Sequence, residues 1–244
     1  MGLSPEPSTP SSSRSRRVAD RGVAPVGPGN VVVRTSRKRL LAPLLLLALL
    51  LPERSLGADG AAGRWVVVQG RVTVAKPGTA DPLPVRPGDT VAVGDLLQTA
   101  GDGRAQALLA DGTVVNLSTG TSVRILQYSF TPESGRRTAV VKIIDGKVRF
   151  IVPAYRYSRF TVESAQATVA AGAADFVALV EAEATTVAAL DGTLKVKNIS
   201  NLIVSDTDLW SNQTTVVRSK TAPSHPAPIA PQQRKEFRRD ARDF

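Results

Sequence analysis

The sequence contains no cysteine and a single histidine, His225. The missing thiols exclude disulfides, thiolate metal sites and cysteine nucleophiles, and one histidine cannot supply the histidine pair of a metal site. His225 lies in the proline-rich stretch 222–231, so the rest of the chain has no histidine base. We therefore expect no cofactor, no metal site and no catalytic residue, and composition points to a binding or structural module.

Aromatic residues are also scarce, at 5% of the chain, whereas hydrophobic residues make up 42%. That hydrophobic fraction is sufficient for one compact domain of roughly 100–200 residues. Its core has to be built mainly from valine, leucine, isoleucine and alanine.

Acidic residues are outnumbered, 21 against 31 Lys and Arg, which gives a net charge of +10. The excess lies at the ends: residues 1–57 carry +6, residues 218–244 carry +4, and residues 58–217 are neutral. Because a nucleic-acid-binding domain needs a basic face on its folded part, we expect no nucleic-acid partner.

Residues 1–33 are rich in Ser, Pro, Arg and Gly without periodicity, which predicts disorder. A basic segment beginning at Arg34 then precedes the apolar run Leu40–Leu51, and small residues follow. This layout predicts a signal peptide over residues 34–57, cleaved between Gly57 and Ala58. An uncleaved anchor with residues 1–39 in the cytoplasm is the alternative. A start codon at Val31, Val32 or Val33 would leave residues 1–30 untranslated.

The middle of the chain reads as short strands separated by glycine-containing turns. Asp111-Gly112, Asp145-Gly146 and Asp191-Gly192 each separate two runs of apolar and β-branched residues. Asp-Gly between such runs is a strong signal for a two-residue hairpin, because both positions tolerate positive φ. We therefore predict three hairpins in an antiparallel meander.

Alternation along these strands predicts which side chains face the core. One predicted inward set is Val148, Phe150 and Val152, and another is Leu194 and Val196, with Lys195 and Lys197 outward. The alanine-rich segment 165–174 favours helix by propensity, but its β-branched residues and the following run 176–180 favour strands.

These patterns predict an all-β domain over residues 58–217, either an antiparallel sandwich of short strands or a short β-solenoid. Residues 218–244 form a tail that is first proline-rich and then basic, and we expect it to be solvated, with a frayed terminal turn.

The run from Gly88 to Leu117 resembles the FecR domain family. It contains two Gly-Asp pairs, the second followed by Leu and Thr, then a glycine-rich turn and an apolar strand ending in Asp111-Gly112-Thr113. The segments 145–150 and 190–196 continue the pattern, so the resemblance covers roughly residues 65–198. It implies a periplasmic β-module.

Two departures limit what the resemblance implies. Where the family often carries Arg-Gly-Thr, this chain has Gly172-Ala173-Ala174, so a role of that arginine is not carried over. Residues 1–39 are too short and too rich in Pro and Ser to supply the cytoplasmic helical region of FecR transducers. The resemblance therefore does not extend to sigma-factor regulation.

The aromatic and basic cluster of residues 153–160 is the candidate site. Tyr155 and Tyr157 are two residues apart, so on a strand they would share a face, with Arg156 on the other and Arg159 nearby. Exposed tyrosines suit a platform for a glycan, peptidoglycan or a partner loop. An ordinary sheet face is the alternative interpretation.

These observations together predict a non-enzymatic periplasmic module that binds an envelope protein or peptidoglycan. Contact with the membrane is expected only if Leu40–Leu51 stays uncleaved. One alternative is a membrane-anchored FecR-type transducer that relays envelope or iron-uptake state. Another is a carbohydrate-active enzyme, although no pair of carboxylates stands out in the sequence.

Overall fold

The computed structural model describes residues 60–79 and 81–239, which fall within one compact unit, Ser55–Phe244. The predicted disorder of residues 1–33, the signal segment 34–57 and the cleavage between Gly57 and Ala58 lie outside the described residues. Among the residues described, no helix is long and apolar enough to cross a membrane.

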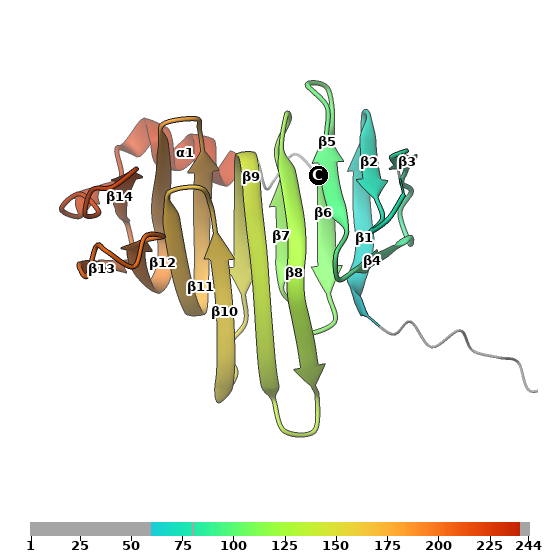
Figure 1. Cartoon of the computed structure of the whole chain (residues 1–244), viewed down its shortest axis with the longest axis horizontal. Helices are drawn as coiled ribbons and strands as arrows, with labels where there is room; N and C mark the ends of the chain where they lie inside the picture. The colour runs from blue at the N-terminus through green and yellow to red at the C-terminus, as the bar shows by residue number, and fades with distance from the viewer. Residues whose placement is uncertain (1–59, 80, 240–244) are drawn as a thin grey trace, which may run out of the picture. The chain divides into compact units, whose positions relative to one another are not determined.

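The described chain is almost entirely β-structure, which confirms the predicted all-β class (Figure 1). Its elements are β1 (Ala61–Gln69), β2 (Val72–Ala75), β3 (Leu83–Pro84), β4 (Thr90–Ala92), β5 (Leu96–Thr99), β6 (Arg104–Leu109), β7 (Val114–Leu117), β8 (Ser122–Thr131), β9 (Arg136–Val152), β10 (Tyr157–Glu163), β11 (Ala167–Val180), β12 (Ala184–Asn198), β13 (Asp206–Trp210), β14 (Gln213–Arg218), β15 (Ala227–Pro228) and α1 (Pro231–Arg239). The alanine-rich segment lies in β11, as its β-branched residues indicate.

Strand pairing divides these strands into two layers. The first layer has the order β3-β2-β5-β8-β9-β10-β11-β12-β13. The second has the order β4-β1-β6-β7-β9-β11-β12-β14-β15. The long strands β9, β11 and β12 belong to both layers, because each bends midway and continues in the other layer.

Two of the three predicted Asp-Gly hairpins are wrong. Asp145-Gly146 and Asp191-Gly192 instead lie where β9 and β12 bend from one layer into the other. Up to Asp145, β9 pairs with β8; from Val148 onward it pairs with β7. Gly146 has φ +93°, and a Cβ there would lie 2.7 Å from the Thr121 Cα. Gly192 is the corresponding bend in β12, with φ +81°. Asp111-Gly112 does lie in a hairpin, joining the antiparallel strands β6 and β7. The connection is longer than the predicted two residues, because β6 ends at Leu109 and β7 begins at Val114, and of the pair only Gly112 has positive φ, at +79°.

One strand pair departs from the predicted antiparallel arrangement. After β9 has crossed into the second layer, the chain returns to the first layer and begins β10 beside the start of β9. The two strands therefore run parallel, with Tyr157 next to Arg136 and Glu163 next to Lys142. This return is what brings distant basic residues together.

The core lies between the layers and follows the predicted alternation. Val148, Phe150 and Val152 are buried, and the Phe150 ring contacts Phe160 of the first layer at a centroid distance of 5.7 Å. Leu194 and Val196 are buried as well. Period-two alternation therefore identified the inward faces correctly.

The described part of the C-terminal tail is mostly exposed, but two of its apolar side chains pack against the domain. Ile229 and Phe237 of the segment containing α1 are buried in a small cluster with Val177, Ala188 and Leu190. These three residues lie on the outer face of β11 and β12, so α1 covers part of the second layer (Figure 1).

Candidate binding site

A fully buried arginine supports the site from within the sandwich. Arg137, near the start of β9, donates from Nη1 to the Asp111 carboxylate at 2.7 Å, and both side chains are inaccessible to solvent. It also donates to the Pro153 carbonyl at 3.2 Å and from Nε to Ser158 Oγ at 3.1 Å. A buried charge persists only when it is paired and hydrogen-bonded, so this set of contacts ties the β6–β7 turn to β9 and to the start of β10.

Tyr128 of β8 completes this buried network. Its hydroxyl accepts a hydrogen bond from the Asp111 amide at 2.8 Å and donates to the Asp111 carboxylate at 3.1 Å. Burial, and then the negative charge of Asp111, raise the pKa of Tyr128 well above its ordinary value. The tyrosine therefore remains a neutral donor, which fixes the orientation of the carboxylate for Arg137.

Immediately outside this network, three exposed arginines surround an exposed tyrosine. The Tyr157 ring is 52% exposed, and the guanidinium carbons of Arg136 and Arg156 lie 5.7 and 5.6 Å from its centroid. With Arg159 they line a depression of about 350 Å³. We call Arg136, Arg156, Tyr157 and Arg159 the arginine cluster.

The arginine cluster carries three positive charges. Within residues 60–79 and 81–239, none of its arginines forms an ion pair. Arg149, on the second layer, differs: its guanidinium forms a two-pronged pair with Asp175 at 2.6 and 2.7 Å. Three uncompensated guanidinium groups around one hollow suit a carboxylate or phosphate ligand, because the planar fork of arginine matches both.

The predicted pairing of Tyr155 with Tyr157 on one face is wrong. β10 begins only at Tyr157, and Tyr155 lies in the connection before it, where strand alternation does not apply. Its hydroxyl donates to the Asp111 carbonyl at 2.8 Å, and its ring packs on Phe130 at 5.0 Å. Tyr155 therefore attaches the connection before β10 to the β6–β7 turn. The exposed surface is formed by Arg156, Tyr157 and Arg159.

Sequence reasoning missed Arg136, which lies 17 residues before the start of the predicted cluster 153–160. It reaches the site through the parallel register that sets it beside Tyr157. The sequence offers a partial signal, two adjacent arginines at the start of a strand, but alternation alone shows only that one faces in and one faces out. Placing the outward one beside Tyr157 requires knowledge of the return of the chain.

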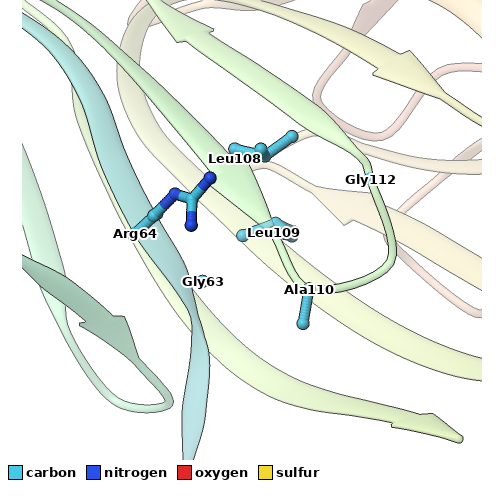
Figure 2. A pocket seen from close by; sticks show the side chains of 6 residues that line it. All are labelled: Gly63, Arg64, Leu108, Leu109, Ala110 and Gly112. Carbon is cyan, nitrogen blue, oxygen red and sulfur yellow. The ribbon is translucent and has the colours of Figure 1, made fainter. Parts of the chain in front are cut away.

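A second hollow, on the outer side of β1 and β6, lacks comparable chemistry (Figure 2). It has a volume of about 400 Å³. Gly63, one of its lining residues, allows β1 and β6 to approach closely, since a Cβ there would lie 2.3 Å from the Leu108 carbonyl oxygen. Arg64 extends over a floor formed by Leu108 and Leu109. A single charged group over leucines does not provide convergent polar contacts.

The part of the chain that the structure describes contains no group of three or more His, Asp or Glu side chains that could hold a metal ion.

Comparisons with known proteins show what part of the domain is similar to. Residues 95–195 match the family model described as FecR protein, which confirms the predicted resemblance. Two crystal structures of a candidate anti-sigma factor from Parabacteroides distasonis ATCC 8503, at 2.50 and 1.65 Å resolution, are similar at 24% identity and a TM-score of 0.45. Each match covers 56% of this chain and 61% of that chain. No curated protein matches the chain.

Proposed function

Because residues 95–195 match the FecR family model, we propose that this protein is a non-enzymatic binding module of the periplasm. FecR proteins are associated with the cell envelope and with signalling. The module would bind an envelope protein or peptidoglycan and would not transform it.

The observation that carries this proposal is the unbalanced charge of the arginine cluster. Its guanidinium groups are exposed, unpaired by acids within the described chain, and carried by strands that the Arg137–Asp111 pair holds in place. A rigid support lowers the entropic cost of binding, since the ligand-contacting residues are already positioned. Carboxylates of peptidoglycan or an acidic patch of a protein would neutralise the cluster.

Site-specific crosslinking in the native envelope tests the proposal. A photoreactive residue replaces Thr138, which lines the depression, in the full-length chain. We expect a discrete crosslinked product that is lost in the triple variant Arg136→Ser, Arg156→Ser, Arg159→Ser. The matched control is Arg71→Ser, Arg86→Ser, Lys220→Ser, which removes the same charge from exposed positions outside the depression. A product that survives in both triple variants would refute the proposal.

A second candidate function is favoured by the FecR match itself. A FecR-type transducer would keep Leu40–Leu51 as an anchor and relay the state of the envelope to a partner. Alkaline carbonate washing of membranes from the native cell separates the two candidates, because it retains an anchored chain and releases a processed one.

A further inference from the structure

A second basic group lies on the same outer face as the arginine cluster. Arg124 of β8 and Lys142 of β9 occupy directly opposite positions in the antiparallel pairing of these strands. Like charges directly opposite each other destabilise a sheet. Within the described residues neither forms an ion pair with an acid, although Glu163 of β10 is the register neighbour of Lys142.

The two basic groups stand at opposite ends of one stretch of β9. Arg136 and Lys142 are six residues apart, which is about 20 Å along a strand. The outward-facing side chains between them come from β8, β9 and β10. Gln127, Ser129, Thr138 and Thr161 are polar, whereas Val140 in the middle of β9 and the exposed Leu126 at the bulge of β8 are apolar. Five basic residues and Glu163 therefore border a largely polar track, which we call the β9 track.

The geometry points to a linear acidic polysaccharide that lies along the β9 track, with acidic groups at both ends of a segment about 20 Å long. This inference rests on the proposed function, because the arginine cluster forms one end of the track. It adds the ligand class and a second contact at Arg124 and Lys142.

The strand pairing favours a glycan over a polypeptide as the occupant. An extended peptide commonly binds a sheet by adding a strand to an edge. Here the first half of β9 is hydrogen-bonded to β8 on one side and β10 on the other, so no backbone edge is available along the track. Hydroxyl and amide side chains instead present donors and acceptors, which suit the hydroxyl groups of sugars.

Calorimetric titration of the purified full-length chain tests the inference with four probes. These are decagalacturonate, trigalacturonate, a neutral maltodextrin of ten units and deca-glutamate. We expect decagalacturonate to bind more tightly than trigalacturonate and deca-glutamate, and the neutral glycan not to bind. The affinity for decagalacturonate should fall with added salt, since exposed charges are screened.

The variant Arg124→Ser, Lys142→Ser isolates the distal contact. We expect its affinity for decagalacturonate to fall about tenfold, to the level of trigalacturonate, because two exposed ionic contacts of about 0.7 kcal/mol each are lost. The control Arg71→Ser, Arg86→Ser should bind as the unaltered chain does. Equal binding of both galacturonate lengths, or an unchanged affinity of the Arg124 and Lys142 variant, would overturn the track. Equal or tighter binding of deca-glutamate would overturn the choice of a glycan.

The two proposals fail in different ways. If the crosslink at position 138 depends on the arginine cluster but decagalacturonate does not bind, the binding module stands and the track is wrong. If decagalacturonate binds along the track but the crosslink is indifferent to the cluster, the track stands and the proposed envelope partner is wrong.

Discussion

Arg136 and Arg137 are neighbours in sequence and have opposite roles. Arg137 faces the core, is fully buried and is paired with Asp111, whereas Arg136 faces solvent beside Tyr157. Strand alternation alone separates a residue that holds the layers together from one that is available to a ligand. The comparison indicates that removing Arg137 should alter stability, and that removing Arg136 should alter binding.

The buried surroundings of Arg137 and the exposed arginine cluster also differ in how their positive charges are compensated. Inside, Arg137 pairs with the Asp111 carboxylate and donates to the hydroxyl groups of Thr113 and Ser158 and to two backbone carbonyl groups. Outside, Arg136 and Arg156 lie over the ring of Tyr157, and neither they nor Arg159 form an ion pair with an acid among the described residues. Desolvation explains the difference, because a buried charge must be paired and an exposed one is stabilised by water.

The largest effect is expected from Arg137→Ala. This substitution leaves the Asp111 carboxylate buried without its cation, and removing one partner of a buried pair costs about 3–5 kcal/mol. Urea unfolding of the full-length chain, monitored by circular dichroism, measures the loss. The double variant Arg137→Met, Asp111→Asn removes both charges and should recover part of it. If Arg137→Ala unfolds at the same urea concentration as the parent, the buried pair does not hold the layers together.

The bends of the long strands should be the next most sensitive positions. Gly146→Ala adds a Cβ that meets the Thr121 backbone at positive φ, so we expect a loss of about 2–4 kcal/mol. Gly112→Ala, in the hairpin turn, meets nothing closer than 3.9 Å and should cost about 1–2 kcal/mol. The urea midpoints of Gly146→Ala and Gly112→Ala, each measured against the parent, compare the cost at a strand bend with the cost at a hairpin turn. Equal losses would show that the crowding at the bend is unimportant.

These glycines also show what the sequence could predict. The Asp-Gly signal reports a need for positive φ, and all three glycines do have positive φ. It does not report whether the chain reverses within a layer or crosses to the other, because that depends on which strands lie alongside. The strand regions and inward faces were predictable from local alternation. The double membership of β9, β11 and β12 was not, since it is set by pairing between distant segments.

The binding site, too, was predictable only in part from the sequence. Arg156, Tyr157 and Arg159 are contiguous in sequence, so composition alone indicated them. Tyr155 was misplaced because the strand begins two residues later than the alternation assumed. Arg136 was missed because the parallel pairing of β9 with β10 depends on the path of the chain between the layers.

The pH dependence of stability tests the role of Tyr128 in the network of Asp111 and Arg137. The pKa of Tyr128 is raised in the folded state, so the unfolded chain loses this proton at a lower pH than the folded chain. The folded state then binds more protons, and stability falls as the pH rises above about 10, the ordinary tyrosine value. We expect Tyr128→Phe to reduce the slope of unfolding free energy against pH in that window. An identical slope in parent and variant would show that this hydroxyl is not held neutral by burial and the charge of Asp111.

The smallest effect on stability is expected on the exposed side, from Arg136→Ala. The side chain lies over the ring of an exposed tyrosine and forms no ion pair with an acid within the described chain, so its removal should change the unfolding free energy by less than about 0.5 kcal/mol. Binding should respond instead, because a guanidinium is lost from the depression that receives the ligand. The crosslink at position 138 and the urea midpoint are therefore measured on the same preparation, beside Arg86→Ala as the exposed control. A lower midpoint with an unchanged crosslink would reverse the roles assigned to the two neighbouring arginines, since the outward residue would then be structural.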